Sequence, residues 1–196
     1  MMEELLREME RYAFEHHVPI INENGRQAFR RIVKECCPHN ILEVGTAIGY
    51  SALLMMEDGA EDAKIVSLEL DAGRAGAARS FLAKSPYADR ISVLVGDAAD
   101  LIGTLHGTYD FVFIDAAKGQ YVDYFKKVLP LLSEHATVLA DNVLFRGYVM
   151  SKEKPPRRYK TIVKRLREYI ELVGNAEGFV TEILKNGDGL AVSRRS

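Results

Sequence analysis

The amino-acid sequence predicts an α/β protein built on a mostly parallel, doubly wound sheet. Between residues 41 and 140, five short runs rich in β-branched and aromatic residues alternate with stretches of helical character. Strands that alternate with helices in this way are typical of parallel sheets. The length of 196 residues and the hydrophobic fraction of 47% suit one domain with a sizeable core. We therefore expect residues 1–196 to form a single domain.

The overall composition excludes few functions but gives no general reason to expect a membrane or nucleic-acid partner. The net charge is −2 and 28% of residues are charged, as in an ordinary globular protein. The two cysteines, Cys36 and Cys37, are adjacent and cannot link distant segments, which fits a reducing cytoplasm. No apolar run is long enough to span a bilayer, so we expect a cytoplasmic protein without a membrane partner.

Residues 1–38 read as two N-terminal helices. An amphipathic pattern predicts a helix from about residue 3 to 16. Pro19 breaks it, because proline cannot continue a helix and restricts the residue before it. A second apolar face, which includes Phe29 and Ile32, predicts a helix over 22–36, and Pro38 stops that helix.

Residues 39–196 form the expected core. The predicted strands are residues 41–44, 65–69, 91–95, 111–114 and 136–140. The predicted helices between and after them are residues 50–56, 74–83, 120–132 and 159–173. Two further strands, 179–184 and 190–193, flank Asn186-Gly187-Asp188-Gly189, whose residues suit a tight hairpin turn.

Polar or glycine residues follow the first three predicted strands. Gly45 and Gly49 bracket the loop after the first strand, where glycine lets the backbone pass close to a ligand. Glu69 ends the second strand, where a carboxylate accepts hydrogen bonds from both ribose hydroxyls of a nucleoside. Asp97 ends the third strand, near the expected position of an adenine. Each acid has a simpler interpretation as a helix cap, but together the three strand ends favour a nucleoside pocket.

The next two strand ends carry the residues that are best suited to catalysis or metal binding. Asp115 ends the fourth strand, and Asp141 and Asn142 end the fifth, so all three supply the oxygen ligands that Mg²⁺ prefers. Lys118 follows Asp115 by three residues. The simpler alternatives are a helix cap at Asp115, a solvated Lys118, and an ordinary turn at residues 141–142. No cysteine and histidine spacing suggests zinc.

A basic segment, residues 151–168, lies shortly after Asn142. It holds eight lysines and arginines against two glutamates, although the whole chain is slightly acidic. Such a segment can contact the phosphates that supply much of nucleic-acid affinity, and an anticodon base in a loop is already accessible. The alternative is a solvated helix face. The tRNA-binding candidates are Arg157, Arg158, Lys160 and Lys164.

Taken together, these motifs resemble the class I S-adenosylmethionine-dependent methyltransferases, and within them the Mg²⁺-dependent O-methyltransferases of the catechol and caffeoyl-CoA type. The resemblance implies a Rossmann-like, seven-stranded, mostly parallel sheet with a C-terminal antiparallel hairpin strand. It also implies Lys118 and Asp115 as catalytic residues, and Asp115, Asp141 and Asn142 as ligands of Mg²⁺ or another divalent cation. The residues it implies for S-adenosyl-L-methionine are Ile21, Glu43, Gly45, Thr46, Gly49, Tyr50, Ser51, Glu69, Asp97, Ala98 and Asp115.

Five stretches are similar, within that family, to the bacterial tRNA 5-hydroxyuridine methyltransferases. They are residues 16–20, 45–51, 115–121, 141–145 and 187–191. This resemblance implies a homodimer that binds a tRNA anticodon loop and converts wobble 5-hydroxyuridine to 5-methoxyuridine. The main alternative is an O-methyltransferase for small catechol-like vicinal hydroxyls. A third, a non-catalytic cofactor- or RNA-binding module, is less consistent with the joint presence of Asp115, Lys118, Asp141 and Asn142.

Overall fold

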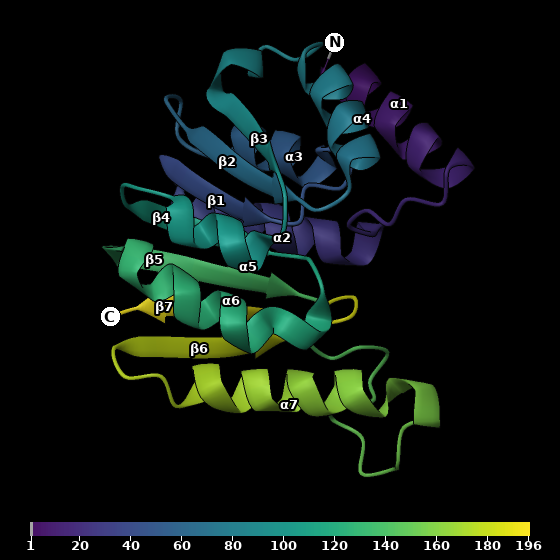
Figure 1. Cartoon of the computed structure of the whole chain (residues 1–196), viewed down its shortest axis with the longest axis vertical. Helices are drawn as coiled ribbons and strands as arrows, with labels where there is room; N and C mark the ends of the chain where they lie inside the picture. The colour runs from purple at the N-terminus through teal and green to yellow at the C-terminus, as the bar shows by residue number, and fades with distance from the viewer. Residues whose placement is uncertain (1) are drawn as a thin grey trace.

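A seven-stranded sheet forms the centre of the computed structural model, which describes residues 2–196. The strand order is β3-β2-β1-β4-β5-β7-β6 (Figure 1). Pairs within β1 to β5 are parallel, whereas β7 runs antiparallel to β5 and to β6. The predicted fold class is therefore confirmed. The strands are β1 (Asn40–Val44), β2 (Lys64–Glu69), β3 (Ile91–Val95), β4 (Tyr109–Ile114), β5 (Leu132–Asp141), β6 (Phe179–Leu184) and β7 (Leu190–Arg195).

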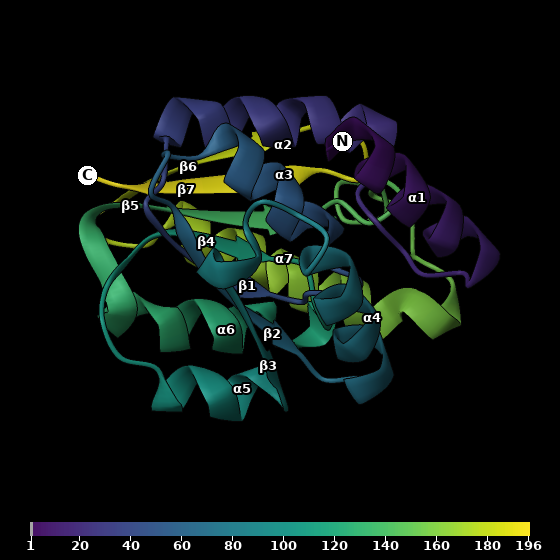
Figure 2. The ribbon, with the colours of Figure 1, turned by 90° about the horizontal axis from the view of Figure 1, so that it is seen from above.

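Helices cover both faces of the sheet. Buried residues of α1 to α4 form one apolar cluster with one face, and those of α5 to α7 form a second cluster with the other. Figure 2 shows α2 and α3 on one side of the strands and α5 and α6 on the opposite side. The helices are α1 (Met2–Glu15), α2 (Glu23–Cys36), α3 (Tyr50–Asp58), α4 (Ala72–Leu82), α5 (Ala98–Leu101), α6 (Tyr121–Val128) and α7 (Lys160–Gly174). None of the described helices is long and apolar enough to cross a membrane.

Strand β4 ends in an uninterrupted apolar run because helices cover it on both sides. In β4, every side chain from Phe111 to Ile114 is fully buried, and the flanking β1 is buried from Ile41 to its end. Neighbouring side chains of one strand enter opposite clusters: Phe111 and Phe113 pack with α1 to α4, while Val112 and Ile114 pack with α5 to α7. This packing fixes where each strand ends, and hence where the following polar residue lies.

Two predicted boundaries were wrong around residue 130. The helix expected over 120–132 stops at Val128 and continues only as a single 3-10 turn, Leu129–Leu131. Strand β5 then starts at Leu132, four residues before the predicted start. Pro130 explains the difference, since it has no N–H to donate to a continuing helix. The short helix α5, which begins directly after Asp97, was not predicted at all.

The strand order reverses between β1 and β4. In an open α/β sheet, ligands bind beyond the carboxyl ends of the strands at such a reversal. Gly45 follows β1 and Asp115 follows β4, and the Asp115 amide donates to the Val44 carbonyl at 2.9 Å. The fold therefore brings the two segments that the sequence singled out into direct contact.

Candidate active site

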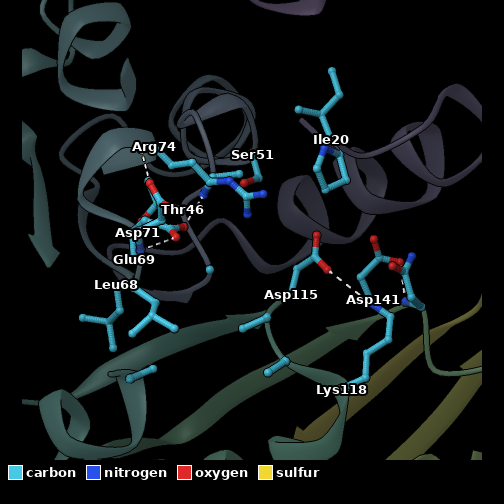
Figure 3. A pocket seen from close by; sticks show the side chains of 18 of the residues that line it. Ile20, Thr46, Ser51, Leu68, Glu69, Asp71, Arg74, Asp115, Lys118 and Asp141 are labelled. Carbon is cyan, nitrogen blue, oxygen red and sulfur yellow. Dashed lines mark hydrogen bonds and ion pairs between the residues drawn. The ribbon is translucent and has the colours of Figure 1, made fainter. Parts of the chain in front are cut away.

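A cavity of about 520 Å³ opens at this reversal. Its walls come from the residues that follow the five strands β1 to β5, together with the segment that leads into α2. Figure 3 shows Asp115, Asp141 and Lys118 grouped on one side of the cavity, and Thr46, Glu69 and Arg74 on the other. The predicted residues that line the cavity are Ile21, Gly45, Thr46, Tyr50, Ser51, Glu69, Asp97, Ala98, Asp115, Lys118, Asp141 and Asn142.

Gly45 is required by the close approach of two strand ends. Its φ is +107°, and a Cβ atom placed there would lie 2.1 Å from the Asp115 carbonyl oxygen. Any side chain would therefore push β1 and β4 apart. Gly49 also has a positive φ of +84°, but its Cβ position faces Leu82 at 3.2 Å. Gly49 thus serves packing between the glycine loop and α4 and does not line the cavity.

Glu69 is held rigidly at the end of β2. One carboxylate oxygen accepts the Ala47 amide at 2.8 Å and the other accepts the Asp71 amide at 2.9 Å. Each oxygen keeps lone-pair capacity for a further donor, which suits a pair of ribose hydroxyls. Asp97 lines the same cavity, and its side chain also caps α5 by accepting the Ala99 amide at 2.8 Å. The capping interpretation is therefore correct for Asp97, alongside its place in the pocket.

Glu43 does not line the cavity. It is fully buried, and the Ser51 and Ser67 hydroxyls both donate to its carboxylate. Ser67 in turn is hydrogen-bonded to Thr46. Burial raises the pKa of Glu43 to about 7, against the opposing effect of the two serine hydrogen bonds. Glu43 therefore supports Thr46 and Ser51, which do face the cavity, from behind.

Two carboxylates and one ammonium group share the other side of the cavity. Lys118 Nζ lies 4.0 Å from Asp115 Oδ1. Burial, reinforced by the negative charge of Asp115, raises the pKa of Asp141 to about 7. Burial also raises the pKa of Asp115, while Lys118 opposes that change. The hydroxyl of the fully buried Tyr121 donates to the Asp141 carbonyl oxygen at 3.0 Å and so fixes the end of β5.

These oxygens fit a hard divalent cation. Asp115 and Asp141 supply carboxylates, and Asn142 supplies an amide oxygen, which is a donor set that Mg²⁺ accepts with water or substrate completing the shell. One ammonium group faces two acidic side chains, so a cation would offset their mutual repulsion. Asn142 has a φ of +57°, which asparagine tolerates better than most residues. Within residues 2–196, no three histidine, cysteine or acidic side chains cluster as an alternative metal site.

The basic segment lies outside the cavity, and its lysine and arginine side chains make different contacts. The Arg167 guanidinium donates to the Tyr148, Val149 and Ser151 carbonyls and so fixes the loop before it. Lys164 and Arg165 pair with Glu168. Lys160 and Lys164 line a separate surface groove on α7. Arg157 and Arg158 are exposed, and across residues 2–196 neither lies within ion-pair distance of a carboxylate.

Several cavity residues were missed in the sequence. They include Asn22, Leu70, Arg74, Gln120 and Tyr124. The sequence does show that the apolar Leu70 directly follows Glu69 at a strand end. In the structure Leu70 is 71% exposed. Asn22 caps α2 by accepting the Gly25 amide at 3.0 Å, so only the tertiary structure reveals its second role at the cavity wall.

Comparison with known proteins agrees with this geometry. A model of the O-methyltransferase family matches residues 1–196, and the chain therefore belongs to that family. Caffeoyl-CoA O-methyltransferase 1 of Arabidopsis thaliana is 28% identical over 180 residues, which cover 86% of this chain and 68% of the relative. Catechol O-methyltransferase of Niastella koreensis is 26% identical over 182 residues, with coverages of 88% and 80%.

Solved structures with bound cofactor are also similar. TomG of Streptomyces achromogenes, an O-methyltransferase involved in tomaymycin synthesis and solved with S-adenosylmethionine, aligns with a TM-score of 0.86 and 25% identity, covering 98% of this chain and 90% of its own. The methyltransferase PaMTH1 of Podospora anserina, bound to S-adenosylhomocysteine, aligns with a TM-score of 0.87 and 26% identity, with coverages of 98% and 88%. The protein is an S-adenosylmethionine-dependent O-methyltransferase of the caffeoyl-CoA and catechol type.

Proposed function

We propose that this enzyme methylates the 5-hydroxyl group of 5-hydroxyuridine at the wobble position of tRNA, in the cytoplasm, as a homodimer that uses Mg²⁺ or another divalent cation. The observation that carries the metal-dependent chemistry is the grouping of Asp115, Lys118 and Asp141 on one wall of the cofactor cavity (Figure 3), which Asn142, the next residue after Asp141, also lines. The support for an RNA acceptor is the basic segment beside that wall and the likeness of five sequence stretches to the tRNA enzymes.

Asp115, Asp141 and Asn142 would hold the cation, which lowers the pKa of an acceptor hydroxyl and fixes its direction. Lys118 lies beside Asp115 and would take the hydroxyl proton on Nζ. The acceptor oxygen then forms a bond to the methyl carbon as the carbon–sulfur bond breaks, and the electron pair of that bond stays on sulfur. Glu69 and Ser51, on the far side of the cavity, would hold the cofactor so that oxygen, carbon and sulfur are in line.

The acceptor needs two adjacent oxygens. In 5-hydroxyuridine these are the hydroxyl and the neighbouring ring carbonyl, and in a catechol they are two neighbouring hydroxyls. The candidate metal ligands accept either pair equally well, so they do not distinguish the substrates. The distinction rests on what lies outside the cavity, where Arg157 and Arg158 are exposed and pair with no carboxylate among residues 2–196.

The test is a methyl-transfer assay with labelled S-adenosylmethionine and Mg²⁺. We expect label in tRNA that contains 5-hydroxyuridine, none in the same tRNA with unmodified uridine, and loss of transfer with a chelator. Reversing the charge of Arg157 and Arg158 should weaken tRNA binding, and more so at low salt. Label in catechol with none in tRNA would reject the RNA substrate. Activity that is unchanged by the chelator would reject the proposed metal dependence.

The second candidate is a small-molecule O-methyltransferase. The relatives named above are described as caffeoyl-CoA and catechol enzymes, which favours a free vicinal dihydroxy acceptor. The same assay separates the two candidates when catechol and caffeoyl-CoA are offered beside tRNA. Comparing kcat/KM for the acceptors then identifies the better substrate.

A further inference from the structure

Three aromatic rings pack together just beyond the candidate metal ligands. The ring centre of Phe145 lies 5.2 Å from that of Tyr159 and 6.5 Å from that of Tyr148, and the latter two lie 5.7 Å apart. All three side chains are partly exposed. The Arg158 guanidinium lies 4.6 Å from the Tyr159 ring centre and that of Arg146 lies 5.7 Å away. We call these five residues the aromatic–arginine cluster.

The backbone that carries the cluster is fixed at several points. The Leu144 amide donates to the Asp188 carbonyl at 2.8 Å, and the Val143 amide donates to the Gly189 carbonyl at 3.1 Å. Phe145 and Arg146 both have left-handed backbone angles, with φ of +41° and +55°. At the far end of the loop, the Arg167 guanidinium binds three main-chain carbonyls. These anchors involve main-chain atoms of the loop, so they survive changes to its side chains.

The cluster also lies at the acceptor side of the cavity. Asn142 lines the cavity, and the Phe145 amide donates to its carbonyl at 3.2 Å. Figure 1 shows the segment between β5 and α7 at the end of β5, where the β5 arrow points. A substrate that places one base in the cavity would therefore bring its neighbouring nucleotides close to these rings.

We propose that the aromatic–arginine cluster is a stacking surface for the unpaired bases next to the target base in an RNA loop. This inference rests on the proposed tRNA substrate. Unstacked bases in RNA loops bind by stacking on aromatic side chains and on guanidinium planes. Arg146 and Arg158 add charge for the phosphates, and across residues 2–196 neither pairs with a carboxylate within ion-pair distance. A cluster that only filled the core would not carry two such arginines on its open side.

The experiment measures RNA affinity by fluorescence anisotropy with a synthetic anticodon stem–loop. We compare the unaltered enzyme with Tyr148→Leu and Tyr159→Leu, which remove a ring but keep apolar volume. Each should weaken binding about tenfold or more, the typical effect of losing one stacked base. The same stem closed as a duplex without a loop should bind all of the proteins equally.

Tyr87→Leu is the matched control. Tyr87 is a partly exposed tyrosine whose ring also carries an arginine, with the Arg90 guanidinium 5.2 Å from its centre, but it precedes β3 at the opposite edge of the sheet. We expect this variant to bind the stem–loop normally. Arg158→Gln leaves every ring in place and removes only the guanidinium that packs on Tyr159. This variant should bind the stem–loop more weakly, and its affinity should depend less on salt than that of the unaltered enzyme.

The outcomes separate the two proposals. If the unaltered enzyme does not bind the stem–loop, the tRNA function fails and the stacking surface fails with it. If it binds but Tyr148→Leu, Tyr159→Leu and Arg158→Gln bind as tightly, with unchanged melting temperatures, the stacking surface alone is rejected. Equal losses for the loop and the duplex probes would also reject stacking and leave a simple electrostatic contact.

Discussion

At the scale of single residues, the acidic wall of the cavity depends on groups that hold the acids in place. Asp141 Oδ1 accepts the amide of its neighbour Asn142 at 2.6 Å, and Tyr121 fixes its carbonyl. Lys118, the group we assign to proton transfer, sits three residues after Asp115 and is 20% exposed. The sequence predicted the two acids only as residues at strand ends. It could not predict the Tyr121 contact, because that contact joins residues twenty positions apart.

Tyr121→Phe should weaken metal binding. The change removes only the hydroxyl that holds the Asp141 carbonyl, so we expect about 1 kcal/mol less stability and a lower affinity for Mg²⁺. Tyr169→Phe is the matched control, because Tyr169 is equally buried, packs on Tyr121, and has a hydroxyl without a hydrogen-bond partner in the described chain. Chemical denaturation and Mn²⁺ titration measure the two effects. Identical behaviour of both variants would contradict the assigned role.

Lys118→Met should lower kcat about 100-fold or more, the usual range for loss of a general base. Binding of S-adenosylmethionine, measured by calorimetry, should change little, because the cofactor side of the cavity is built by other residues. Lys126→Met, an exposed lysine on α6, is the control and should be fully active. A normal kcat for Lys118→Met would remove the lysine from the mechanism.

At the scale of secondary-structure elements, the reversal of strand order between β1 and β4 creates the site. The alternation of strands and helices predicted a doubly wound sheet of this kind, and the polar strand ends predicted part of the cavity wall. Two kinds of detail were beyond the sequence. The Gly45 contact with Asp115 joins segments seventy positions apart, and α5 is a single short turn whose pattern is too brief to read. Glu43 was predicted to bind the cofactor, but it is fully buried and does not line the cavity, which only the folded chain reveals.

Gly45→Ala should abolish cofactor binding and lower the free energy of unfolding by several kcal/mol. The added methyl group would overlap the Asp115 carbonyl, and the positive φ would be strained as well. Gly76→Ala is the control: Gly76 lies in α4 with open space around its Cβ position, so alanine should stabilise the protein by about 0.5–1 kcal/mol. Thermal melts and calorimetric titration with S-adenosylmethionine test both. Normal cofactor affinity in Gly45→Ala would refute the steric argument.

At the scale of the whole molecule, the uneven distribution of charge matters more than the total of −2. Positive side chains gather along the loop and helix after β5, while Glu69 and Asp141 lie buried at the strand ends. Glu43 and Asp141 hold protons more tightly in the folded state than in the unfolded chain, because burial raises the pKa of both side chains. Stability should therefore depend on pH, and in a direction set by the raised pKa values.

We predict that the protein loses stability as the pH rises from about 5 to about 8 in the presence of a chelator. The folded pKa of Glu43 is about 7 against 4.5 for the free side chain, so its contribution is present at low pH and is lost as the pH passes 7. The loss from this group is roughly 3 kcal/mol at most. Glu43→Gln should flatten the dependence measured by urea denaturation at both pH values. An equally steep loss in that variant would exclude Glu43 as a source.

The contacts between the loop after β5 and the Gly187–Gly189 turn have a consequence for synthesis. Val143 and Leu144, which directly follow Asn142, donate their amides to main-chain carbonyls that lie more than forty positions further along the chain. A nascent polypeptide that has already passed Asn142 still lacks the turn, and β7 beside β5 as well. Fragments that stop before residue 187 can therefore contain every candidate catalytic residue and still be inactive. We therefore expect methyl transfer only after translation has moved well beyond the candidate catalytic residues.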